Sequence, residues 1–158
     1  MRLFRELFGI AVVAFATLAT GCQKPIDNEQ PLPGMAVTYY TIDGAWQLDT
    51  WNGEALAEGT ALYIEFSQKE RRFEMWDNLN SMYMVETTGN FAITQDEYER
   101  YVLSGWYDYG VGDWASDYSV TMNTSGEYMF WIKIIGDDQG IGNSENMVFK
   151  RIDNIPAF

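Results

Sequence analysis

The 158-residue chain contains no histidine and only one cysteine, Cys22. Zinc and haem sites that use histidine, and catalysis by Cys–His or Ser–His–Asp groups, need side chains that this chain lacks. Basic residues are also few, 10 against 23 acidic ones, which gives a net charge of −13. This charge disfavours nucleic acid and anionic membrane surfaces as partners. We therefore expect no metal, no cofactor, no nucleic-acid partner and no enzymatic activity.

Long hydrophobic runs are absent as well. The longest apolar stretch, residues 7–20, is shorter than the roughly 20 apolar residues that cross a bilayer. It follows Arg2 and Arg5, and this order of a basic and then an apolar region is typical of a signal peptide. We expect residues 1–21 to be such a signal, whose removal leaves a net charge of −14, because Arg2, Arg5 and Glu6 leave with it.

The end of this stretch, Leu18-Ala19-Thr20-Gly21-Cys22, resembles the bacterial lipobox. That resemblance implies cleavage before Cys22 and its acylation, and several acyl chains anchor a protein stably to a membrane. Residue 23 is glutamine and not the aspartate associated with inner-membrane retention, so we expect lipid anchoring at the outer membrane, facing the periplasm or the cell surface. A secretory signal followed by a chance cysteine is the alternative.

Three of the four prolines lie in residues 22–43, among small and polar residues. This composition is typical of a flexible tether, so we predict that the folded domain spans residues 44–158.

A sustained 3.6-residue apolar period is absent too, and from Gly44 onward short alternating segments are separated by turn residues. We predict eight strands at about residues 45–51, 60–66, 72–76, 82–94, 98–107, 114–123, 128–134 and 146–152. Strands in meander order with short turns close most readily into a barrel without open edges. The predicted fold is all-β, an eight-stranded antiparallel up-and-down barrel.

Two segments then resemble the lipocalins and other calycins: Gly44-Ala45-Trp46 at the first strand, and Phe149-Lys150-Arg151-Ile152 at the last. The resemblance implies that Trp46 plugs one end of the barrel and that Arg151 packs across its indole. With Leu103-Ser104-Gly105-Trp106-Tyr107 in the middle, the chain is similar to short lipocalin-like lipoproteins of Bacteroidetes. An eight-stranded barrel can be filled by its own side chains or can hold one small ligand.

Acidic residues gather at two predicted turns, with Asp108, Asp113 and Asp117 at one and Asp137, Asp138 and Glu145 at the other, where Asn143 adds an amide oxygen. Paired carboxylates can serve glycoside hydrolysis, and oxygen ligands can serve calcium. Turns favour aspartate in any case, and the second loop lacks the EF-hand spacing. Solvated acidic turns are therefore the preferred interpretation.

Aromatic residues make up 16% of the chain. We predict a candidate ligand-binding rim at Trp106, Tyr109 and Trp114, and a core position for Tyr118. If Phe73, Met75, Phe130 and Ile132 face inward, alternation turns Trp51, Trp76 and Trp131 outward, where they form a contact surface or pair across strands.

Two functions remain open. The first is a non-enzymatic binder of a small apolar or glycan ligand. The second is a structural or accessory envelope lipoprotein with a filled barrel, which acts through a protein partner.

Overall fold

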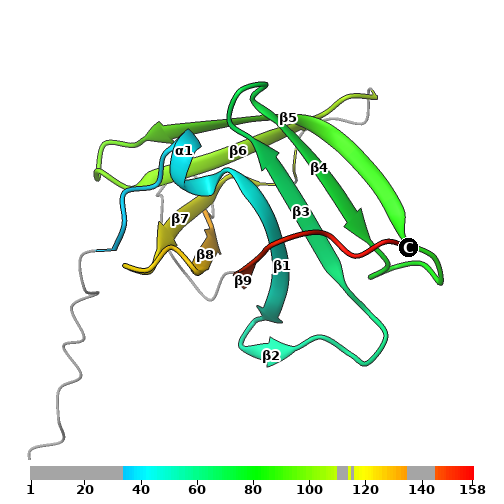
Figure 1. The fold of residues 1–158 in the computed structure, drawn as a ribbon. Coiled ribbons are helices and arrows are strands. Elements are labelled where there is room, and N and C mark those ends of the chain that lie inside the picture. Colours follow the sequence, from blue (N-terminus) through cyan, green and yellow to red (C-terminus); the bar gives the residue numbers. More distant parts are fainter. Residues whose placement is uncertain (1–33, 110–113, 115, 135–144) are drawn as a thin grey trace, which may run out of the picture. The chain divides into compact units, whose positions relative to one another are not determined.

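The computed structural model describes residues 34–109, 114, 116–134 and 145–158. A short helix precedes one antiparallel sheet (Figure 1). The elements are α1 (Tyr39–Ile42), β1 (Gly44–Trp51), β2 (Glu54–Ala55), β3 (Leu62–Ser67), β4 (Arg72–Asp77), β5 (Val85–Gln95), β6 (Tyr101–Tyr107), β7 (Tyr118–Met122), β8 (Tyr128–Lys133) and β9 (Asn146–Ile152). Within the described ranges, the chain has no helix of the length and apolarity that a membrane span requires.

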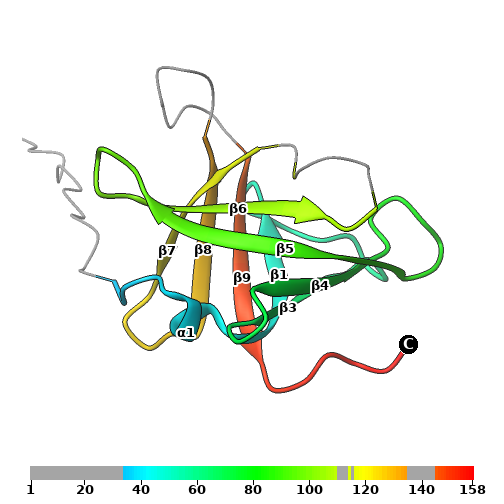
Figure 2. The same cartoon turned by 90° about the horizontal axis from the view of Figure 1, so that it is seen from above.

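The sheet closes on itself. Each long strand pairs with the next in sequence, and β1 pairs with β9 from Ala45↔Ile152 to Trp51↔Met147. β2 is a two-residue extension that pairs only with the end of β1. The predicted eight-stranded antiparallel up-and-down barrel is therefore confirmed. Figure 2 shows β7, β8, β9 and β1 side by side, with β5 and β6 crossing over them.

Local turn chemistry explains where several strands begin and end. Asn52 and Gly53 both have positive φ, 52° and 81°, which is the geometry of a two-residue hairpin turn. β6 begins at Tyr101 and not at Tyr98, because the Asp96 carboxylate accepts hydrogen bonds from the backbone N–H groups of Tyr98 and Arg100. This turn uses residues that alternation alone assigned to the strand.

The segment before β1 packs against the barrel, although the sequence placed it in the tether. Val37 and Ile42 are fully buried, and Met35 forms a β-bridge with Met122. The Tyr39 hydroxyl accepts a hydrogen bond from the backbone N–H of Ile93 at 3.1 Å. The packed region therefore begins near Met35 and not at Gly44. The apolar side chains of this segment lie between polar residues in the sequence, but they still reach the core.

Trp46 and Arg151 meet at the end of the barrel that α1 covers. The Trp46 indole is fully buried and donates from Nε1 to the Ile42 carbonyl at 2.8 Å. The Arg151 guanidinium lies 4.2 Å from the indole centroid and donates to the carbonyls of Asp43, Thr41 and Gly126. Gly44, with a φ of 100°, lies beside this guanidinium. These contacts close this end of the barrel.

Alternation predicted the inward face correctly in β4 and β7 but not in β8 or at the end of β1. Phe73, Tyr118, Val120 and Met122 are buried, as predicted. In β8, however, Trp131 is buried and Phe130 is exposed. Both faces of β8 carry large apolar side chains, so alternation does not specify which one fills the lumen.

In β1, the pairing with β9 shifts register between Leu48 and Thr50. A β-bulge adds one residue and reverses the faces beyond it. Trp51 therefore packs against the core instead of facing outward. Trp76, by contrast, lies outside, beside the C-terminal segment, as alternation predicted.

Candidate functional site

A cavity of about 230 Å³ lies at the end of the barrel opposite Trp46 and Arg151. Most of its wall is apolar or aromatic, with a few polar groups. Its lining consists of Trp51, Leu62, Ile64, Met75, Asp77, Leu79, Asn80, Tyr107, Trp114, Tyr118, Trp131, Glu145, Met147 and Phe149. These side chains come from β1, β3, β4, β6, β7, β8 and β9 and from three loops, so only the closed barrel assembles the site.

A stack of aromatic rings forms one wall of this cavity. The indoles of Trp114 and Trp131 lie 5.3 Å apart with an interplanar angle of 29°. Tyr118 and Phe149 pack on Trp131 at 5.3 and 4.6 Å. Such offset ring contacts add stability beyond the burial of area. These four rings therefore form one continuous apolar wall of the cavity.

Gly105 makes the position of Trp114 possible. A Cβ atom at residue 105 would lie 2.2 Å from Cε2 of the Trp114 indole, which is far inside contact distance. The Trp114 backbone N–H also donates to the Gly105 carbonyl at 2.8 Å. The loop after β6 thus folds its tryptophan back over a glycine and into the lumen. This explains why Trp114, a predicted rim residue, is only 9% exposed.

The polar groups of the cavity are mainly acidic. Asp77 and Glu145 are in its lining, and Glu145 pairs with Lys133 at 3.4 Å. Burial raises the pKa of Tyr118 to about 12, with the charge of Glu145 as the next cause. Burial, and then the charge of Asp77, raise the pKa of Tyr107 as well. Both phenols are therefore neutral in the physiological range.

One buried donor in the wall lacks a partner. Nε1 of Trp131 is the only buried side-chain nitrogen or oxygen of the described residues without a hydrogen bond, and the side chain is 4% exposed. Buried polar groups in folded proteins almost always have partners, and an unmade bond costs about 1–3 kcal/mol. The unmade bond at Trp131 is therefore an energetic cost that the packing of the aromatic wall must offset.

The three residues of the predicted rim do not form one site. Trp114 lines the cavity, whereas Trp106 is 41% exposed, opposite Asn90 in the β5–β6 ladder, on the outer face. Tyr109 is 85% exposed and borders a second hollow together with Glu86, Thr88 and Asp108. Sequence reasoning missed Trp51 and Trp131 as cavity residues, because it turned both outward.

Neither described aspartate of the first acidic turn lines this cavity, whereas Glu145 of the second turn does. Both oxygens of Asp108 accept from the guanidinium of Arg72, and one also accepts from the Thr88 hydroxyl. These bonds hold the pKa of Asp108 below its usual value and leave it structural. Asp117 is exposed. In the part of the chain that the structure describes, no group of three or more acidic, His or Cys side chains is arranged to hold a metal ion.

Other predicted residues lie outside the described residues: Cys22 and the signal peptide, Asp113, and the loop residues Asp137, Asp138 and Asn143.

The fold and the cavity together define a class of protein: a closed eight-stranded antiparallel barrel with an aromatic cavity at one end. This architecture is compatible with a lipocalin-like fold. A scan against protein-family models, a search of curated proteins and a search of solved structures each found no match to the chain.

Proposed function

We propose that this protein is a lipid-anchored, lipocalin-like lipoprotein of the bacterial envelope that binds a small apolar ligand without transforming it. The cavity of about 230 Å³ at the open end of the barrel carries this proposal. An apolar cavity of about 150 Å³ takes benzene, so this one has room for a compound of about two fused rings. The cavity is smaller than most drug-sized sites, which begin at about 300 Å³, so the ligand is small.

The composition of the cavity favours binding over catalysis. Its titratable groups are two carboxylates and two phenols, and one carboxylate is paired with a lysine. The described lining offers no nucleophile beside a base, which covalent catalysis requires. Rigid aromatic walls with few polar groups are typical of a site that recognises shape.

Anchoring at Cys22 and an outer-membrane location belong to the same proposal. The lipobox-like segment supports them, and an origin in Bacteroidetes is part of the family resemblance. Labelling of cells with a fatty-acid analogue tests the anchor. We expect the wild-type chain to incorporate the label and Cys22→Ser to lose it, and a wild-type chain without label would overturn the anchor.

Ligand binding is tested by calorimetry on the full chain with Cys22→Ser, which cannot be acylated at that residue. The probes are naphthalene, quinoline, a long-chain fatty acid and a set of oligosaccharides. We expect saturable binding of the ring compounds and a higher melting temperature, since a ligand that binds only the folded state stabilises it.

A cavity-filling variant locates the site. Leu79 lines the cavity, so Leu79→Trp should abolish ring-compound binding. Thr121→Trp adds the same indole to the exposed face of β7 and should leave binding unchanged. If oligosaccharides bind and ring compounds do not, the ligand is a glycan. If nothing binds, the barrel acts without a ligand.

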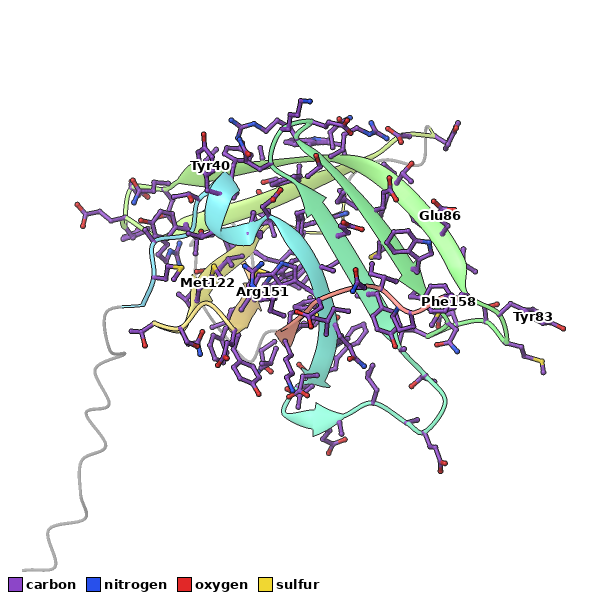
Figure 3. All side chains as sticks on the ribbon, in the orientation of Figure 1. Tyr40, Tyr83, Glu86, Met122, Arg151 and Phe158 are labelled. Atoms are coloured by element: carbon purple, nitrogen blue, oxygen red, sulfur yellow. The ribbon has the colours of Figure 1, made fainter. Side chains whose placement is uncertain are left out.

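The β4–β5 hairpin supports a second candidate, an accessory lipoprotein that acts through a protein partner. Met82 and Tyr83 are 90% and 79% exposed and, with Met84 and Val85, form four consecutive apolar residues. Figure 3 shows Tyr83 pointing away from the barrel. Exposed apolar runs of this kind mark interaction sites or aggregation liabilities. A photocrosslinking residue at position 83 should capture one specific envelope protein in cells, and diffuse labelling would count against this candidate.

A further inference from the structure

The outer face of β3 and β4 carries a hollow that is separate from the ligand cavity. We infer that this hollow docks a basic segment of a protein partner, with an arginine or lysine side chain beside Trp76. The hollow lies on the outside of the barrel, so this inference does not depend on what the cavity binds.

The hollow, of about 490 Å³, lies between the sheet and the C-terminal segment, residues 153–158. Figure 1 shows this segment crossing the outer side of β3 and β4. The ring of Phe158 packs on Tyr63 of β3, with the centroids 5.7 Å apart, which places the segment over the sheet. One side of the hollow is therefore the C-terminal segment, and the other is the outer face of the sheet with Trp76.

Three glutamates surround Trp76 on this face. Glu65 is directly opposite Glu74 in the β3–β4 ladder, and Glu74 is two residues from Trp76 along β4. Glu86 of β5 is directly opposite Trp76 on the other side. All three glutamates are exposed, and in the described part of the chain no lysine or arginine forms an ion pair with them. Like charges directly opposite each other destabilise a sheet, so this arrangement has a cost that folding does not explain.

The charges select a cation as the occupant of the hollow. Asp153 adds another carboxylate to its lining, which contains no lysine or arginine. Arg72 lies on the same face of β4, but Asp108 already binds its guanidinium. A cationic side chain beside an indole and carboxylates gains cation–π attraction and charge pairing, and its apolar stem can pack along the wall. A second copy of the chain is disfavoured as the occupant, because both copies carry a net charge of −13.

Two peptides of nearly equal shape test the requirement for a cation. One is acetyl-Gly-Arg-Gly-Arg-Gly-amide, and the other has uncharged citrulline in place of both arginines. The protein is again the full chain with Cys22→Ser, with labelled tryptophan for nuclear magnetic resonance. We expect the arginine peptide to bind about two- to tenfold more tightly and to move the indole resonance of Trp76, which Trp76→Phe assigns. Most of this difference should be lost at about 1 M salt, where the Debye length is about 3 Å.

Two double variants with the same change in net charge locate the binding. Glu65→Gln with Glu74→Gln removes charges beside the hollow and should weaken binding of the arginine peptide about two- to tenfold. Glu97→Gln with Glu99→Gln removes two exposed charges from the turn after β5 and should leave binding nearly unchanged. The first variant should also have a higher urea midpoint than the parent chain, because its two side chains no longer repel each other. Weaker binding by this variant is then not a consequence of unfolding.

A pair of tryptophan substitutions tests the ring. Trp76→Leu should weaken binding of the arginine peptide about two- to fivefold, which is the value of an exposed cation–π contact. Trp106→Leu changes another tryptophan of the outer face and should have little effect, because the nearby Asp108 is already paired with Arg72.

A photocrosslinking residue at position 154, in the wall of the hollow, tests for the partner in cells. It should capture one envelope protein through a peptide that contains arginine or lysine, and Glu65→Gln with Glu74→Gln should abolish this product. No product, or a product that persists in the double variant, would refute a protein partner at this surface. If the two peptides bind equally, no cation is selected, and if both double variants weaken binding equally, only the net charge attracts the peptide. Either result would overturn the inference and leave the ligand cavity unaffected.

Discussion

Replacement of Gly105 by alanine should disturb the cavity wall through one contact, the Trp114 indole. The new Cβ would lie 2.2 Å from Cε2 and 2.3 Å from Cδ2, and ordinary contact begins at 3.4 Å. The indole must therefore withdraw by more than 1 Å, although Trp131 and Phe73 pack on it at 5.3 and 5.0 Å. Overpacking of this kind costs about 1–3 kcal/mol.

A double-mutant cycle with Trp114→Leu isolates this contact. Once the indole is absent, Gly105→Ala should cost nothing, or should stabilise the strand by about 0.5 kcal/mol, because glycine is unfavourable in a strand interior. Gly59→Ala is the matched control: no atom lies within 4 Å of its Cβ, so only its φ of 81° is strained. The cost of Gly59→Ala should be the same with and without Trp114.

Urea unfolding followed by far-ultraviolet circular dichroism measures all these variants. With a slope of about 1–3 kcal/mol per molar urea, a loss of 2 kcal/mol lowers the midpoint by about 1 M. If Gly105→Ala costs the same in the Trp114→Leu background, the assignment of Gly105 as the space for the indole is refuted. Ring-compound binding by Gly105→Ala alone should weaken as well, since the displaced indole changes the cavity wall.

Three further predictions concern the barrel. Gly89→Ala should destabilise the protein more than Gly105→Ala does, because its Cβ would lie 2.1 Å from the backbone oxygen of Trp106. A urea midpoint equal to that of the wild type would contradict this prediction. Arg151→Lys should lower the free energy of unfolding by about 2 kcal/mol, because an ammonium cannot donate to three carbonyls and also stack on Trp46. An unchanged urea midpoint would refute the role of Arg151 in closing this end of the barrel. The pKa of Tyr118 is raised by burial from 10 to about 12, so stability is fully present below pH 10 and should fall by about 2–3 kcal/mol as the pH rises to 12. Tyr118→Phe should remove most of this decline, and an equally steep decline in that variant would assign it to other groups.

The sequence by itself determined the class of fold and the order of its strands. Alternation marked strands such as β3 and β9, and Asn52-Gly53 specified a tight hairpin, because these signals depend on neighbouring residues only. Likewise, the sequence places Trp46 in the first strand and Arg151 in the last one. The structure pairs these two strands and brings the two side chains into contact.

Only the tertiary structure decided which side chains line the cavity. Alternation has two phases, and where both faces of a strand are apolar, as in β8, the choice between Phe130 and Trp131 depends on which ring fits the lumen. The bulge in β1 likewise turns Trp51 inward through its pairing with β9, which lies far away in sequence. Trp114 joins the cavity because its loop folds back over Gly105. Each of these choices depends on packing between distant segments, so local sequence signals cannot specify them.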